Sequence, residues 1–412
     1  MRILIAGTTY HPALNGQAVF MVNLAEGLAG RGHEVAVLFP DAHSYSEVRN
    51  GVQTEAVGSV SLTFIHGESY APFIFTKVRR VFESFRPDVV HIQDHYPLSV
   101  VAVRQARRRG IPVIGTNHYS PASLEPYIPG SAWTKSLLDR ILWEWMLRLF
   151  RRLDCVTAPS PAAVNLLRDL GLRVPMHAVS CGTDLERFHL DPSVDRDSCR
   201  LQYGLDPRRK IFLYVGRVDQ EKRIDILLRA VHELRRADVQ LAVAGHGADL
   251  GALQRLAQEL QLGDKVHFIG PVRNEELNRL LNSVDVFTMA GEAESLSIAS
   301  LEAMASGRPV LLADAFALPQ LVAQGVNGYL FKSGDPRDAA RCMEQLLGES
   351  ARWAEMGRAS MELVKPHSLD HTLEQYTTLY VQLLEGAPAL TPAAGAAVAN
   401  RGPEIAHRSG RP

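Results

Sequence analysis

Short β-branched runs alternate with amphipathic helical stretches along nearly the whole chain, and this alternation restricts the possible folds more than any other feature. It is typical of βαβ units, in which helices cover a parallel sheet. The expected strands form two groups. The first group is 3–6, 34–39, 62–65, 89–92, 113–116, 155–158 and 177–179. The second is 211–215, 241–244, 266–268, 286–289, 310–313 and 329–331. We therefore expect an α/β protein with two doubly wound, Rossmann-like domains that face each other across a cleft.

The domain limits follow from changes in composition. A segment rich in Asp, Arg and Pro separates the two strand groups, and we expect a linker at 186–209. The N-terminal domain then covers 1–185 and the C-terminal domain 210–367. A last helix at 368–385 is expected to cross back to the N-terminal domain. Residues 386–412 are rich in Ala, Pro, Gly and Thr, which predicts a disordered tail.

Composition excludes several classes of protein. With 46% hydrophobic residues in 412, the chain can bury real cores. Lys plus Arg is 44 and Asp plus Glu is 45, so the net charge of −1 argues against a nucleic acid partner. The four cysteines lack zinc-site spacing, and we expect buried thiols in a reducing compartment. The sequence has no signal-peptide pattern and no apolar run long enough to span a bilayer. We expect a cytoplasmic protein, at most peripheral on the inner face of a membrane.

Candidate binding residues follow strand ends, where α/β sheets bind ligands. Gly16 stands in the loop after the first strand and would let backbone amides approach an anion. Arg217 and Lys222 follow strand 211–215 and could clamp a diphosphate, although a solvated charge run is the alternative. Gly245 belongs to a Gly-His-Gly turn that is weak evidence for a nucleotide and better evidence for a tight turn.

The most informative pair is Glu294 and Glu302, which are separated by seven residues. The spacing places one carboxylate in the loop after a strand and the other two turns into a helix, on the same side. Such a pair can accept hydrogen bonds from two sets of sugar hydroxyls. The alternative is that both carboxylates are solvated, but the helix between them is apolar and built of small residues.

Together these motifs resemble the retaining glycosyltransferases of family 4, and the resemblance covers about residues 1–385. It implies the GT-B fold and the transfer of a hexose from a UDP- or GDP-sugar, such as UDP-glucose or GDP-mannose, without a metal or other cofactor. The implied acceptor is a hydroxyl compound. A membrane glycolipid or diacylglycerol is the sharper hypothesis, and a soluble small molecule or a polysaccharide is the alternative.

The resemblance also implies roles for individual residues. Arg217, Lys222 and Gly16 match positions at the donor diphosphate, and Glu294 and Glu302 match the glutamates that bind the donor sugar and the ribose. Further positions match by their place in a loop or at a helix start. Ser297 and Ile298 would face the phosphates with their amides, while Val272 and Arg273 would lie at the base.

The N-terminal half offers a second set of loop residues. His118 matches the family histidine near the anomeric carbon, although a lone loop histidine is more often structural. With Glu294, Arg217 and Lys222 it completes the predicted catalytic set. Asp94, His95, Asn117 and Tyr119 are expected on the acceptor side.

Segment 133–153 holds three of the four tryptophans and two apolar stripes at helical spacing. We expect the first stripe to pack into the domain; it consists of Leu137, Leu138, Ile141, Leu142, Trp145 and Leu149. The second stripe lies beside Arg140 and Arg151 and suits an anionic membrane; it consists of Trp143, Leu147 and Phe150. The alternative is that another element covers the second stripe.

Two other classes of protein fit the sequence less well. An NAD-dependent oxidoreductase shares the βαβ pattern, but neither glycine-rich turn supplies the full dinucleotide fingerprint. A sugar-binding module without activity would not need the Arg217 and Lys222 pair.

Overall fold

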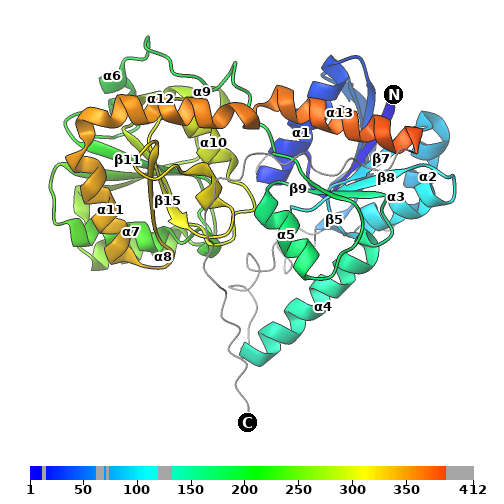
Figure 1. The fold of residues 1–412 in the computed structure, drawn as a ribbon, viewed down its shortest axis with the longest axis horizontal. Helices are drawn as coiled ribbons and strands as arrows, with labels where there is room; N and C mark the ends of the chain where they lie inside the picture. The colour runs from blue at the N-terminus through cyan, green and yellow to red at the C-terminus, as the bar shows by residue number, and fades with distance from the viewer. Residues whose placement is uncertain (12–14, 62–68, 71–73, 119–131, 387–412) are drawn as a thin grey trace.

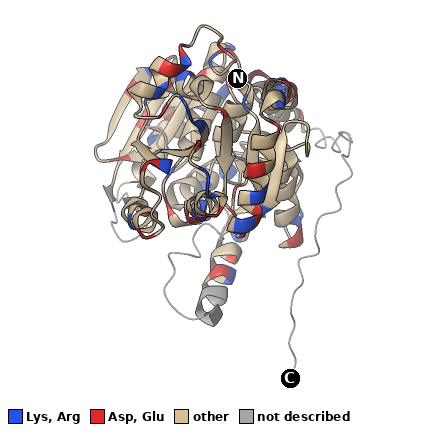
Figure 2. Ribbon diagram, turned by 90° about the vertical axis from the view of Figure 1, so that its left-hand side faces the viewer, with Lys and Arg blue, Asp and Glu red and all other residues tan. Residues whose placement is uncertain are grey.

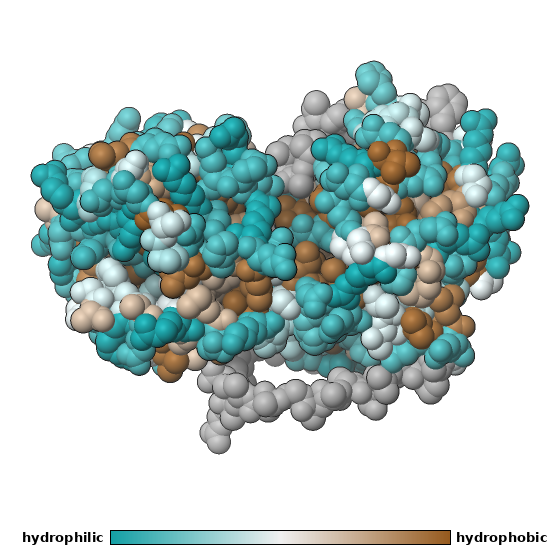
Figure 3. Space-filling view, turned by 90° about the horizontal axis from the view of Figure 1, so that it is seen from above, coloured by the Kyte–Doolittle hydropathy of each residue, from teal (hydrophilic) through white to brown (hydrophobic). Residues whose placement is uncertain are grey.

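The computed structural model describes residues 1–11, 15–61, 69–70, 74–118 and 132–386. Two α/β bodies lie side by side, the first half of the chain on the right of Figure 1 and the second half on the left. Seen from above, they are two lobes with a hollow between them (Figure 3). The expected two-domain α/β architecture is confirmed. The predicted tail from 387 onward lies outside the described residues.

The first sheet has the strand order β10-β9-β8-β7-β1-β2-β4-β3, and all neighbours are parallel except β3 and β4. Its strands are β1 (Arg2–Ala6), β2 (Glu34–Asp41), β3 (Tyr45–Arg49), β4 (Val52–Gly58), β7 (Val89–Ile92), β8 (Val113–Thr116), β9 (Cys155–Ala158) and β10 (Met176–Ala178). A separate small ribbon pairs β5 (Val60–Ser61) with β6 (Ser69–Tyr70).

The hairpin of β3 and β4 was not predicted, and the strand expected at 62–65 lies outside the described residues. β3 is an edge strand with four exposed residues, so it carries no apolar alternation. The turn, however, has a recognisable sequence. Asn50 and Gly51 have φ values of 49° and 79°, and Asn-Gly is the residue pair that favours a tight hairpin turn.

The second sheet has the order β13-β12-β11-β14-β15-β16 and is parallel throughout. Its strands are β11 (Lys210–Val215), β12 (Val239–Ala244), β13 (Val266–Gly270), β14 (Val286–Met289), β15 (Val310–Asp314) and β16 (Gly328–Lys332). Each of these strands overlaps an expected one. Strands buried on both faces are almost continuously apolar, and such runs are easy to recognise in a sequence.

Helices cover both faces of each sheet (Figure 1). In the first half they are α1 (Gly16–Gly30), α2 (Ile74–Phe85), α3 (Pro97–Arg107), α4 (Ala132–Phe150) and α5 (Pro161–Asp169). In the second half they are α6 (Arg196–Gln202), α7 (Ile224–Leu234), α8 (Leu250–Glu259), α9 (Asn274–Ser283), α10 (Ile298–Ala305), α11 (Pro336–Gly348), α12 (Trp353–Val364) and α13 (Leu369–Glu385). Lys and Arg alternate with Asp and Glu over the side seen in Figure 2, as the balanced composition suggests.

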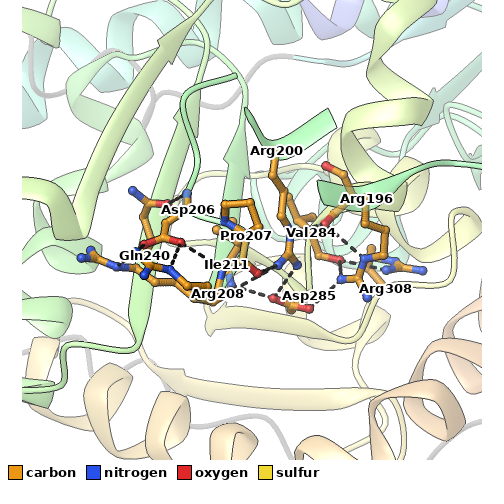
Figure 4. Close-up of polar contacts among 12 residues, drawn as sticks. Arg196, Arg200, Asp206, Pro207, Arg208, Ile211, Gln240, Val284, Asp285 and Arg308 are labelled. Atoms are coloured by element: carbon orange, nitrogen blue, oxygen red, sulfur yellow. Dashed lines mark hydrogen bonds and ion pairs between the residues drawn. The ribbon is translucent and has the colours of Figure 1, made fainter. Parts of the chain in front are cut away.

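An ion-pair cluster around the buried Asp285 ties the connecting segment to the second sheet (Figure 4). Asp285, just before β14, accepts from Arg200 Nη2 at 2.9 Å and from Arg196 Nη2 at 2.6 Å. The same carboxylate accepts the backbone N–H of Ile211 at 2.8 Å. Because Arg196 and Arg200 both belong to α6, this short helix is fixed at the amino ends of β11 and β14.

α13 follows the second sheet in sequence but packs against α1 of the first body. The helices lie so close that a Cβ atom at Gly27 would come within 2.5 Å of Leu373 Cδ1. The two segments that connect the domains lie side by side around Thr183. Two backbone hydrogen bonds join them, from Thr183 N to His367 O and from Leu369 N to Thr183 O, each 2.8 Å long. The C-terminal helix therefore belongs physically to the N-terminal body.

A buried polar network anchors α13 to the first sheet. His91 hydrogen bonds to Tyr380 through Nδ1 and to Thr116 through Nε2, both at 2.7 Å. Tyr376 reaches Thr116 at 3.1 Å and Thr157 at 3.2 Å. Burial lowers the pKa of His91 to about 3, so the ring is neutral and can donate one proton and accept another. The network joins the ends of β7, β8 and β9 to one helix.

For the second stripe of α4 the alternative holds, because other elements cover it, whereas the expectation that the first stripe packs into the domain was wrong. The stripe assigned to the membrane is buried: Trp143, Leu147 and Phe150 are 7, 3 and 0% exposed. Met146, which the prediction left out, completes that stripe at i, i+3, i+4 and i+7. Both faces of the helix are apolar, so periodicity alone could not determine which one meets the sheet.

The stripe expected in the core is instead largely at the surface. Leu138, Ile141 and Trp145 are 38, 56 and 41% exposed, whereas Leu149 is buried. The side chain of Leu137 lies outside the described residues. The described part of the chain contains no helix long and apolar enough to cross a membrane.

The buried network makes a testable prediction about stability. Tyr380→Phe should lower the free energy of unfolding by about 1–3 kcal/mol, because Nδ1 of His91 is left without its partner in a dry site. Urea unfolding measures this change. Thr378→Val, at an exposed position of the same helix, is the control and should cost less than about 0.5 kcal/mol. Equal effects of the two substitutions would contradict the role of the network.

Candidate active site

The loop after β11 carries the two predicted cations, and in the structure both have carboxylate partners. Arg217 pairs with Asp219 and, at 2.5 Å, with Oε1 of Glu221. Lys222 ends a short 3-10 turn (Gln220–Lys222) and places Nζ 2.7 Å from Oε1 of Glu294. Lys222 and Glu294, 72 residues apart in sequence, are thus brought into direct contact.

The loop after β14 is held to the loop after β11 by a second ion pair as well. Arg223 Nη1 lies 2.6 Å from Oε1 of Glu292, and Arg223 has a φ of 50°, which turns the chain into α7. The Lys222 and Glu294 side chains are only 19 and 12% exposed, so their attraction is screened less than that of a surface pair. Two loops from neighbouring strands therefore form one charged surface at the carboxyl edge of the second sheet.

The Gly-His-Gly turn after β12 packs beneath that surface. A Cβ atom at Gly245 would lie 1.8 Å from the carbonyl oxygen of Gly216, and one at Gly247 would lie 2.3 Å from that of Val218. Only glycine fits at either position. The backbone N–H of Ala248 donates to Asp219 at 2.9 Å, which joins the turn to the carboxylate that holds Arg217. The interpretation as a tight turn therefore has a clear physical basis.

α10 begins at the predicted place. Ser297 is its N-cap, and its side chain accepts from Ser300 N at 3.2 Å, so the free amides of the first turn start at Ile298. The opposite body comes close at this point: a Cβ atom at Gly16 would lie 3.8 Å from Ile298 Cδ1. Two residues predicted to face the phosphates thus approach each other from the two domains. A helix N-terminus with free amides favours an anion.

Glu302, the second predicted carboxylate, lies about one turn after Ile298 in α10. Burial raises its pKa to about 8, and the guanidinium of Arg187 opposes this effect. Val272 and Arg273 precede α9, and the Arg273 side chain is 76% exposed and pairs with Glu276 at 2.8 Å. The Arg273 side chain therefore lies largely at the surface.

In the first body, Asp94 ties two loops together. Its Oδ2 accepts from the backbone of Thr8 at 2.6 Å and from Gln17 at 3.4 Å. Its Oδ1 accepts from Ser99 Oγ at 2.6 Å and from the backbone of Tyr96 at 3.1 Å. Asp94 is 6% exposed, so the carboxylate is engaged by four donors and fixes the loop that leads to α1.

His95 and its neighbours form an aromatic group that reaches the surface. His95 stacks on Tyr96 with ring centroids 4.6 Å apart, and Trp145 of α4 meets His95 edge-on at 4.8 Å. His95 is 2% exposed, whereas Trp145 is 41% exposed. The exposed face of α4 is therefore continuous with the predicted acceptor-side loop.

His118 and Asn117 follow β8 as predicted. Asn117 is 3% exposed, and its backbone N–H donates to Thr157 O at 2.8 Å. His118 packs on Phe20 of α1 at 4.9 Å and its Nε2 lies 3.0 Å from Oε1 of Gln93. Tyr119 lies outside the described residues. Sequence reasoning missed Gln93 and Glu221, although each stands in a loop directly beside a predicted residue.

Comparison with known proteins identifies the arrangement. The model described as "Glycosyltransferase Family 4" matches residues 14–187, and the model described as "Glycosyl transferases group 1" matches residues 195–362. The chain belongs to glycosyltransferase family 4. Members of this family transfer a sugar from a nucleotide-sugar donor and retain its configuration, so the chain is a retaining glycosyltransferase. The alternative of an oxidoreductase was wrong.

Individual relatives of this family 4 enzyme span most of its length. A GDP-mannose-dependent alpha-mannosyltransferase of Corynebacterium glutamicum is 28% identical over 93% of this chain and 88% of its own. An alpha-monoglucosyldiacylglycerol synthase of Streptococcus pneumoniae is 27% identical over 80% of this chain and 75% of its own. The solved structure of a sucrose-phosphate synthase from Thermosynechococcus elongatus superimposes with a TM-score of 0.79 at 21% identity, covering 94% of this chain and 100% of its own. That likeness establishes the GT-B fold.

The raised pKa of Glu302 predicts how stability depends on pH. The folded state holds the proton more tightly than the unfolded state, so stability falls as the pH rises from about 4.5 through about 8. Glu302→Gln removes this titration. Its melting temperature, relative to the parent, should therefore rise between pH 5 and pH 8.5 in the absence of donor. A difference that stays constant over this range would show that Glu302 titrates normally.

Proposed function

We propose that this family 4 enzyme transfers a hexose from a UDP- or GDP-sugar to a hydroxyl of a lipid-linked acceptor at a membrane surface. The observation that carries the proposal is the contact of Lys222 with Glu294 at 2.7 Å, beside an α10 N-terminus that faces Gly16. The start of α10 in one body thus lies beside the glycine loop of the other, and Glu294 of the ion pair stands in the loop that leads into α10.

The diphosphate is the first ligand this surface suits. Charge develops on the departing diphosphate, and Arg217, Lys222 and the first amides of α10 can stabilise it. In the structure both cations are paired with carboxylates. Donor binding therefore exchanges partners: Lys222 turns to a phosphate oxygen, and the Glu294 carboxylate is released to accept hydrogen bonds from hydroxyls of the donor sugar.

The nucleoside half of the donor would lie along α10. Glu302 would accept the ribose hydroxyls, and the loop of Val272 and Arg273 would contact the base, with Gly245 shaping the floor. Ribose binding favours the ionised form of Glu302, so donor affinity should include the work of removing its proton at neutral pH.

Attack on the anomeric carbon occurs on the side of the leaving diphosphate. The described loops of the first body hold one buried carboxylate near the predicted acceptor side, Asp94, and four donors already engage it. This engagement argues against Asp94 as a nucleophile. A phosphate oxygen of the donor then takes the acceptor proton, and His118 contacts the sugar.

The acceptor would approach along the α4 face defined by Leu138, Ile141 and Trp145. Trp145 touches His95, so an apolar tail resting on α4 would leave its hydroxyl near the loop after β7. Arg148 is 73% exposed on the same helix and suits anionic headgroups. Two names among the relatives concern sugar transfer, and one of them a diacylglycerol lipid. We place the enzyme at the inner face of a membrane.

The donor hypothesis predicts the behaviour of site variants. In a screen of UDP- and GDP-hexoses, mass spectrometry should detect nucleotide release from one donor. Lys222→Ala and Glu294→Gln should each lower that release by about 100-fold or more, because the transition-state charge or the sugar contact is lost. Lys265→Ala, in the same domain at the amino end of β13, is the control and should retain full turnover. Near-normal turnover by both site variants would contradict the donor hypothesis.

The membrane hypothesis predicts the behaviour of the α4 face. In a flotation assay with anionic vesicles the parent should rise with the lipid, and the double variant Ile141→Ser with Trp145→Ser should stay at the bottom. The lost apolar contact is the physical reason. Val326→Ser, which removes a side chain that is 52% exposed on the other domain, should float normally. A parent protein that never floats would refute membrane contact.

A further inference from the structure

Gln93 is buried between the loop after β1 and the loop after β8. It is the first residue after β7 and is 1% exposed. Its backbone N–H donates to Ala6 O at 2.8 Å, which continues the pairing of β7 with β1. A Cβ atom at Gly7 would lie 3.0 Å from Gln93 Cβ and 2.8 Å from Met21 Sδ, so the side chain of Gln93 packs closely against the loop after β1. Gln93 is therefore held in place by its surroundings.

The two ends of the Gln93 amide differ. Oε1 lies 3.0 Å from Nε2 of His118, whereas Nε2 has no hydrogen-bond partner among the described residues and is fully buried. Buried amide hydrogens in folded proteins are almost always paired. An unpaired one beside a candidate substrate residue points to a partner that arrives with the ligand.

We propose that Gln93 is a positioning residue for His118 and a second contact to the sugar hydroxyls. Its Oε1 accepts a hydrogen bond from Nε2 of His118, which keeps the ring proton on Nε2 and leaves Nδ1 to accept a proton from a sugar hydroxyl. The side-chain Nε2 of Gln93 donates a hydrogen bond to a hydroxyl oxygen of the sugar. A sugar hydroxyl both donates and accepts, and this pair of residues offers one group of each kind. The inference rests on the proposed role of His118 at the donor sugar.

The surroundings of His118 support a single neutral form. Burial lowers its pKa to about 3, so the ring carries one N–H at every working pH. His91 of β7 is also neutral, with a pKa of about 3, and α1 contributes the uncharged ring of Phe20. No charge on these neighbours selects the tautomer, so the hydrogen bond to Gln93 does.

Two substitutions separate the parts of this role. Gln93→Met keeps the length and apolar stem but removes both hydrogen bonds, so the KM for the donor should rise about tenfold with a smaller change in kcat. Gln93→Glu keeps an acceptor for His118 but adds a charge, which raises the pKa of His118. The acidic limb of its pH profile should therefore move up by more than one unit, with activity lost as the pH falls.

The control is Gln105→Met, at a glutamine of α3 that is 7% exposed, and it should leave KM and the pH profile unchanged. Calorimetry with UDP or GDP alone should give equal affinities for the parent and both Gln93 variants, because the nucleotide does not touch this loop. Lys222→Ala should lose that affinity. An unchanged donor KM in Gln93→Met together with a parental pH profile in Gln93→Glu would overturn the proposal.

A measurement that does not depend on activity tests the positioning role separately from the proposed function. Nitrogen-15 NMR of histidine-labelled protein should show the Nε2–H tautomer for His118 in the parent and a mixture of tautomers in Gln93→Met, with His118→Gln used to assign the signal. The same tautomer mixture in the parent would refute the positioning role. If the parent shows the Nε2–H tautomer but transfers no sugar, the proposed function is refuted and the positioning role of Gln93 is retained.

Discussion

The attachment of α13 to the first sheet is the constraint on which the rest of the structure depends. α13 ends the chain segment that builds the second domain, yet Tyr376 and Tyr380 hydrogen bond to groups at the ends of β7, β8 and β9. These strand ends lead directly into the loops of Gln93, His118 and Asn117. One helix therefore fixes the loops of the first domain and, through its connection, limits how the second domain can face them.

The cationic side chains of the second domain that follow β11 are neutralised by neighbouring carboxylates. Asp219, Glu221 and Glu294 outnumber Arg217 and Lys222, so this surface is not strongly cationic. In the proposed function, these ion pairs hold the two cations in defined positions, which would lower the ordering cost of donor binding. The proposed donor would then have to displace a carboxylate, so a group that cannot replace the ion pair would gain little from this surface.

Much of the second domain could be predicted from sequence because its strands are buried on both faces. β11 to β16 form apolar runs, and the Glu294 and Glu302 spacing locates α10 between two of them. The hairpin of β3 and β4 was missed because its edge strand lacks an apolar pattern, although Asn50 and Gly51 mark its turn. The burial of α4 could not be predicted, because both faces of the helix are apolar and packing selected the one with Met146. Likewise, nothing in the sequence shows that Gln93 meets His118, since that contact depends on how two adjacent strands end together.

Gly16 has a consequence for how the two domains are spaced. It belongs to the first domain, and its missing side chain faces Ile298 of the second, where even a methyl group would already be in van der Waals contact at 3.8 Å. A larger side chain at position 16 would act as a wedge that holds the two lobes apart. Position 16 is thus one of the points at which the two domains come into contact. Loss of activity after its enlargement would then measure the width of the gap rather than the chemistry within it.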